Sequence, residues 1–143
     1  MKNYQGPVEF VKPIWGEMEG PKWRDFDTVV GRLNTPELLD YWEQNNLGYE
    51  LYIGSRKSDR SVFESKSANC KDTSEFTVYC LSKSGYDAGL LWVESRIPEG
   101  HIITIFEDKG KQFIMDNGKP RPKGLIGPIK SFSEAGYIIQ GNL

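Results

Sequence analysis

Apolar residues at helical spacing predict a first helix over about Pro36–Asn45. Leu38, Leu39 and Trp42 fall on one face of that segment, which is the pattern of a helix that packs against a core. Thr35 stands directly before it as a good N-cap, and proline fits the first helical position because its missing N–H has no partner there anyway. We therefore expect a helix that begins sharply after Thr35.

A second helix is predicted from about Cys70 to Ser84. Asn69 is a plausible N-cap, and Gly85 suits the left-handed position that often follows a helix. The apolar stripe of this helix comprises Thr73, Phe76, Tyr79 and Cys80. The other cysteine, Cys70, lies in the first turn, about 15 Å from Cys80 at 1.5 Å per residue, so an intact helix keeps the two thiols apart.

The second half of the chain predicts an antiparallel sheet. Its three clear strands are Ala88–Glu94, His101–Glu107 and Gln112–Asp116. Shorter strands are expected at Val8–Val11, Tyr49–Ile53, Ile126–Ile129 and Tyr137–Ile139, with an irregular lead-in over residues 1–33 and a polar loop or short helix over Gly54–Asn69. Helices followed by antiparallel strands define an α+β fold.

Length and charge narrow the class of protein. The 143 residues form one predicted domain, 1–143, with no internal repeat. The net charge of −2 argues against nucleic acid as a partner, because nucleic-acid-binding surfaces are usually basic. No apolar run is long enough for a membrane helix and the start does not resemble a secretory signal, so we expect no membrane partner and a cytoplasmic protein.

Metal and disulfide chemistry is disfavoured by the residue counts. The chain has two cysteines and one histidine, whereas a structural zinc site needs four such ligands. A single possible cysteine pair is not a disulfide framework. We therefore expect no metal and no cofactor.

The hairpin between the second and third strands brings His101 near Asp116. A tight turn at Asp108–Lys109 places His101 opposite Asp116, and a three-residue loop with a bulge at Gly110 places it opposite Asn117. Opposed side chains have Cβ atoms about 4.5–5.5 Å apart, within reach of an imidazole–carboxylate hydrogen bond. Such a pair is common on protein surfaces, so it does not by itself indicate catalysis.

Cys70 makes the pair more informative. A helix N-terminus favours a thiolate and lowers the pKa of a thiol. A buried structural cysteine is the alternative interpretation of Cys70, and it is our interpretation of Cys80.

The order of these features resembles the transglutaminase-like superfamily of papain-like cysteine enzymes, in particular its bacterial transglutaminase-like type. The matching pieces are Ser67–Asp72, Ser84–Ala88, Gly100–His101 and Phe113–Gly118. In that family a Cys begins a helix, a Gly-Tyr-x-Ala turn leads into the first strand, a His opens the second strand and an Asp closes the third. The match covers about Leu33–Gly118, roughly 60% of the chain, with the three residues 31 and 15 positions apart.

The resemblance implies a Cys-His-Asp triad. Cys70 would be the nucleophile, His101 the general base and acid, and Asp116 the residue that orients the imidazole. The backbone N–H of Cys70 would be one oxyanion donor. The second donor stays open among upstream residues that include Trp42, Gln44, Tyr49 and Tyr52. The sequence departs from the family at Ala68, Asn69, Thr73 and Ser74, which puts the substrate preference and the activity itself in question.

The implied function is a thiol-dependent hydrolase or acyl transferase that acts on a peptide or glutamine amide, with a peptide or protein as substrate. The alternative is a catalytically silent domain of the same fold that serves as a protein-interaction module. A third reading, a peptide-crosslink hydrolase of the cell envelope, is disfavoured by the absence of a recognisable signal in the sequence.

Overall fold

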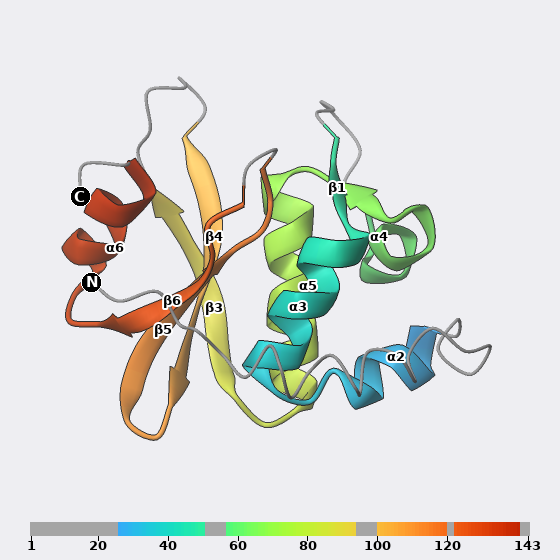
Figure 1. The fold of residues 1–143 in the computed structure, drawn as a ribbon, viewed down its shortest axis with the longest axis horizontal. Coiled ribbons are helices and arrows are strands. Elements are labelled where there is room, and N and C mark those ends of the chain that lie inside the picture. Colours follow the sequence, from blue (N-terminus) through green and yellow to red (C-terminus); the bar gives the residue numbers. More distant parts are fainter. Residues whose placement is uncertain (1–25, 51–56, 94–99, 120–121, 141–143) are drawn as a thin grey trace.

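A four-stranded antiparallel sheet with helices on both faces organises the molecule (Figure 1). The computed structural model describes residues 26–50, 57–93, 100–119 and 122–140. The elements in chain order are α2 (Phe26–Arg32), α3 (Pro36–Asn46), β1 (Gly48–Tyr49), α4 (Asp59–Ser65), β2 (Ser67–Ala68), α5 (Cys70–Lys83), β3 (Asp87–Val93), β4 (His101–Asp108), β5 (Lys111–Asp116), β6 (Gly124–Ile129) and α6 (Phe132–Gln140). The strands run in the order β3-β4-β5-β6, so the α+β class expected from the sequence is confirmed.

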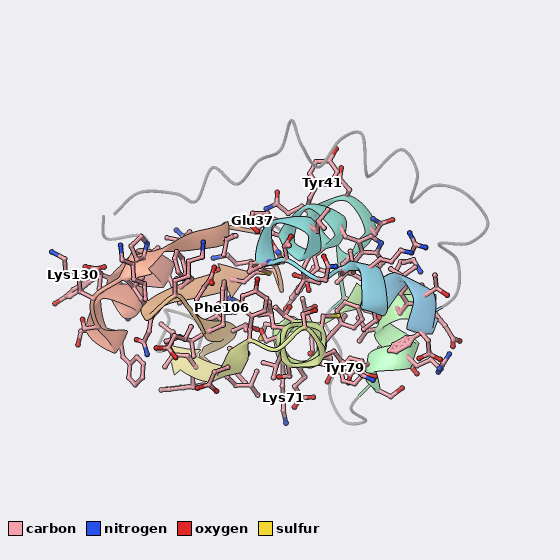
Figure 2. The ribbon with its side chains drawn as sticks, turned by 90° about the horizontal axis from the view of Figure 1, so that it is seen from below. Glu37, Tyr41, Lys71, Tyr79, Phe106 and Lys130 are labelled. Carbon is pink, nitrogen blue, oxygen red and sulfur yellow. The ribbon has the colours of Figure 1, made fainter. Side chains whose placement is uncertain are left out.

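Two hydrophobic cores lie on the two faces of the sheet. The larger core joins the sheet to α2–α5 through an aromatic cluster in which Trp42 stacks between Phe63 and Phe76, with ring centroids 5.7 Å from each. Figure 2 shows Phe106 between the sheet and α5, whereas Lys71 on the same helix points outward. The smaller core packs isoleucines of the sheet against α6.

Both predicted helices form with their expected caps. The Thr35 side chain accepts the N–H of Leu38, and the Asn69 side chain accepts the N–H of Asp72. Each cap satisfies one of the N–H groups that the first turn leaves without a partner. Gly85 has a φ of 92°, the left-handed conformation expected after α5.

The hairpin turn differs from both predicted registers. Asp108 pairs with Lys111, so the two-residue loop is Lys109–Gly110, and both residues have positive φ. That conformation is typical of the hairpin turn whose twist matches the flanking strands. Thr104 therefore pairs with Met115, and His101 lies diagonally from Asp116 instead of directly opposite it or Asn117.

Three further expectations need correction or comment. The predicted short strand Tyr137–Ile139 is wrong, because these residues belong to α6, which buries Ala135, Ile138 and Ile139. The lead-in expected to be irregular ends in α2, and the polar stretch contains α4, which agrees with the short helix that was the alternative to a loop there. The strand expected at Val8–Val11 lies outside the described residues, as does most of Tyr49–Ile53.

The buried position of Cys80 allows a stability prediction. Cys80 has no exposed surface and belongs to the larger core. We expect Cys80→Ala to lower the free energy of unfolding by about 1–2 kcal/mol, because a small cavity replaces the sulfur. Ser82→Ala, at an exposed position of the same helix, is the matched control and should change it by no more than about 0.5 kcal/mol. Urea denaturation of both variants checks the difference, and equal stabilities would contradict it.

Candidate active site

The first turn of α5 presents Cys70 at the edge of the sheet. Asn69 is extended and caps the helix, with its Oδ1 atom 2.9 Å from the N–H of Asp72. Cys70 is the first helical residue and is half-buried. Its thiol therefore lies at the positive end of the helix dipole, where a negative charge is favoured. The start of α5 and the start of β4 lie together at the upper edge of the molecule in Figure 1.

Two hydrogen bonds hold α5 against β4 close to this point. The Ser74 hydroxyl donates to the carbonyl of Ile102 at 2.9 Å, and the Thr104 hydroxyl donates to the carbonyl of Ser74 at 2.9 Å. Ser74 and Thr104 are both buried. Ser74, one of the departures from the family pattern, thus fixes the helix beside the strand that carries His101.

The imidazole of His101 lies between Cys70 and Asp116. Its Nε2 atom is 2.7 Å from Oδ1 of Asp116, and both side chains are buried, with 9% and 1% of their surfaces exposed. A hydrogen bond also joins His101 to the thiol of Cys70. Since Asp116 occupies Nε2, the ring nitrogen left for the thiol is Nδ1. The structure therefore brings together all three residues that the sequence selected.

The electrostatics of the cluster favour a thiolate–imidazolium pair. Burial raises the pKa of the Cys70 thiol, but the hydrogen bond from His101 and backbone hydrogen bonds at Ile102 and Lys71 outweigh burial and lower it below its ordinary value. Burial lowers the pKa of His101, but its bonds to Asp116 and Cys70 raise it to about 9. Each partner thus favours the charged form of the other.

Asp116 has a second cationic neighbour. The ammonium group of Lys119 lies 3.3 Å from Oδ2, the carboxylate oxygen that does not bind His101. Lys119 was not among the predicted site residues, although its position three residues after Asp116 was a usable signal.

Two glycines permit close packing around the cluster. A Cβ atom at Gly118 would lie 2.6 Å from Cα of Cys70, so the backbone after β5 rests directly on the start of α5. Gly100 has a φ of 74°, and a Cβ there would lie 2.5 Å from the indole nitrogen of Trp92. Trp92 is 55% exposed and so forms part of the surface beside His101.

Other upstream residues are placed as follows. Trp42, one of the open oxyanion candidates, is buried in the aromatic cluster, and Gln44 donates to the carboxylate of Asp40. Tyr49 is 38% exposed, and Tyr52 lies outside the described residues. Glu43 was not among the predicted site residues, and Asn117 was considered only as a residue opposite His101. The Asn117 amide donates to the Glu43 carboxyl group at 2.9 Å next to Asp116, and the available signal was a glutamate beside the apolar stripe of α3.

The described residues provide neither a metal-binding cluster nor a membrane-spanning helix. Within residues 26–50, 57–93, 100–119 and 122–140, no group of three or more His, Cys, Asp and Glu side chains could hold a metal ion. None of the helices in these ranges has the length and apolar character needed to cross a membrane.

The comparisons with known proteins identify a fold. No protein-family model and no curated protein matches the sequence. Among solved structures, the fold is similar to that of a "putative cysteine protease" from Cytophaga hutchinsonii, with a TM-score of 0.53 and 16% sequence identity. The similarity covers 72% of this chain and 37% of the other, so the chain matches well under half the length of that protein. The likeness is one of fold, and it supports the α+β architecture.

The two thiols should differ sharply in reactivity. We expect iodoacetamide to alkylate Cys70 with a midpoint below the ordinary cysteine pKa of about 8.5, because His101 stabilises the thiolate. Cys80 should not react in the folded protein, since burial raises the pKa of its thiol. Mass spectrometry of the alkylated peptides across pH checks both statements.

His101→Gln is the matched variant for this experiment. It removes the cation but keeps a polar side chain of similar reach, so the Cys70 midpoint should move upward. A wild-type midpoint at or above about 8.5, or an unchanged midpoint in His101→Gln, would contradict the ion pair.

Proposed function

We propose that the protein is a thiol-dependent hydrolase or acyl transferase that acts on a peptide or glutamine amide. The observation that carries this proposal is the position of His101, whose Nε2 atom lies 2.7 Å from Oδ1 of Asp116 and whose ring also interacts with the Cys70 thiol. A nucleophile, a base and a group that orients the base constitute the arrangement of a catalytic triad. The cysteine-protease-like fold supports the same class.

The proposed reaction starts from the thiolate–imidazolium pair. The sulfur of Cys70 attacks the amide carbonyl carbon, a C–S bond forms, and the carbonyl electron pair moves to oxygen. The N–H of Cys70 at the helix N-terminus can donate to this oxyanion. When the oxyanion collapses, the C–N bond breaks and the leaving nitrogen takes the proton of His101 Nδ1, which gives a free amine or ammonia and a thioester on Cys70.

The second half of the reaction restores the enzyme. Water or an amine attacks the thioester carbonyl while His101 accepts the proton of the attacking group. The C–S bond then breaks, and the sulfur leaves as the thiolate beside the imidazolium. Asp116 stabilises the imidazolium in both halves and keeps Nδ1 directed at the sulfur. Water yields a carboxylic acid, and an amine yields a new amide.

Trapping the thioester tests the proposal directly. The full chain is incubated with glutamine-containing peptides and peptide amides, quenched in acid, and examined by mass spectrometry for an acyl group on Cys70. Cys70→Ala should form no adduct and Cys80→Ala should form it normally. Adding a primary amine to the reaction distinguishes acyl transfer from hydrolysis by the product.

The interaction module is the opposing outcome of this experiment. If the domain is catalytically silent, the wild type and Cys70→Ala should bind peptides equally well. Neither should form a thioester or turn over any substrate of the panel. That result would overturn the proposed activity while leaving the fold and the ion pair intact.

The role of Asp116 gives a kinetic prediction. We expect Asp116→Asn to fold, because asparagine is isosteric and retains a polar atom for His101. The turnover should fall on the order of 10²–10³-fold, less than the roughly 10⁴-fold known for the serine version, because a thiolate needs less help from its base. Turnover and melting temperature are measured together, and an unchanged rate would make Asp116 a structural carboxylate.

A further inference from the structure

Glu43 is a fully buried carboxyl group that contacts Asn117, the residue next to Asp116 of the proposed triad. It lies on α3, which otherwise turns apolar residues toward the core, and 1% of its surface is exposed. One oxygen lies 2.9 Å from Nδ2 of Asn117, and the other lies 2.6 Å from the hydroxyl of Thr77 on α5. A buried carboxyl group on an otherwise apolar helix face requires an explanation.

The protons of this cluster can be counted. The Thr77 hydroxyl also lies 3.0 Å from the carbonyl of Thr73, and a hydroxyl has one proton to donate. If Glu43 carries a proton on Oε2, it donates to Thr77, and Thr77 donates to Thr73. Every short contact is then a complete hydrogen bond, so the geometry favours a neutral carboxylic acid.

The charges around Glu43 agree with this count. Burial is the largest influence and raises the pKa of Glu43 to about 8, and the Asp40 carboxylate on the same helix acts in the same direction. The bonds from Asn117 and Thr77 oppose the shift without cancelling it. On α5, the charge of an ionised Glu43 would in turn raise the pKa of the Cys80 thiol. Glu43 thus remains protonated at neutral pH.

Asn117 connects this carboxyl group to the proposed catalytic site. Its Nδ2 atom donates to Glu43 and to Asp40, each at 2.9 Å. Asn117 follows Asp116 directly, and the next residue, Gly118, packs on the backbone of Cys70. Asp40 also accepts a backbone hydrogen bond from Leu125 in β6. One face of α3 therefore holds the end of β5 and the start of β6.

We infer that Glu43 is a positioning residue, which acts through Asn117 to hold the Asp116–Gly118 backbone so that Asp116 meets His101 and Gly118 seats against Cys70. The inference rests on the proposed function for the role of Asp116, but it concerns the placement of this segment and not the substrate. Glu43 touches none of the reacting groups. Its effect reaches them through Asn117, whose side chain joins α3 to the end of β5.

Ionisation of Glu43 should loosen this segment. Two carboxylates, those of Asp40 and Glu43, would then share one amide group and repel each other. Thr77 would have to turn its proton from Thr73 to the new charge, which leaves a buried carbonyl without that bond. The ordered segment should therefore become less protected as the pH rises through about 8.

The experiment compares the wild type with Glu43→Gln and Asn117→Ala. Glutamine reproduces the neutral acid, because its oxygen can accept from Asn117 while its NH₂ group donates to Thr77, and it cannot ionise. Pulsed hydrogen exchange at residues 116–119, corrected for the intrinsic rate, is followed from pH 6.5 to 9.5. Protection should fall near pH 8 in the wild type; this step should be absent in Glu43→Gln, in which only the later loss of the His101 cation, with a pKa of about 9, acts on the segment.

Alkylation of Cys70 by iodoacetamide is the second measurement and needs no substrate. At pH 6.5, Glu43→Gln should react at the wild-type rate. Asn117→Ala should react on the order of tenfold more slowly, which corresponds to an increase of about one unit in the thiol pKa. Asn45→Ala is the matched control, because Asn45 also lies on α3 but its side chain donates to the carbonyl of Tyr41 in the same helix.

The possible results separate this inference from the proposed function. Equal loss of protection in the wild type and Glu43→Gln, or a wild-type alkylation rate in folded Asn117→Ala, overturns the positioning role. Should Asn117→Ala fail to fold, the comparison of wild type with Glu43→Gln decides alone. Absence of thioester formation would overturn the catalytic proposal and leave both of these measurements valid.

Discussion

The packing of the first turns of α5 onto the start of β4 is the constraint on which the rest of the structure depends. Ser74 and Thr104 exchange hydroxyl-to-carbonyl hydrogen bonds across this contact, each worth about 1 kcal/mol and costly to leave half made. They fix the position of the helix along the strand, and therefore the position of Cys70 relative to His101. The hairpin then carries Asp116 to the other side of the same imidazole.

Two buried carboxyl groups beside this contact differ because their partners differ. Asp116 meets nitrogen cations through separate oxygens, His101 at 2.7 Å and Lys119 at 3.3 Å, an environment that suits a carboxylate. Glu43 instead meets a hydroxyl and an amide beside another acid, an environment that suits a neutral acid. Asp116 therefore supplies negative charge to the proposed site, whereas Glu43 helps to position the backbone of that site.

Local signals predicted much of this arrangement from the sequence. The caps Thr35 and Asn69 act over three residues, so they could be read directly. The hairpin register was missed because Lys109 adopts a positive φ that few lysines take, and α6 was missed because tertiary burial decides the structure of an apolar run. The bond between Glu43 and Asn117 spans 74 positions of the chain, and no local pattern predicts a contact of that kind.

The two cysteines of α5 show how far position alone determines reactivity. They share one helix and one chemistry, yet burial raises the pKa of Cys80 while the pKa of Cys70 is lowered against the effect of burial. Cys80 packs among apolar side chains in the last turn of the helix, where a negative charge has no compensating partner. Cys70 stands where the helix begins, so that free N–H groups, the dipole and His101 all act on its sulfur. The chemistry of the site is therefore determined by the N-terminus of the helix, and it depends on the contacts that hold this end of the helix beside the strands.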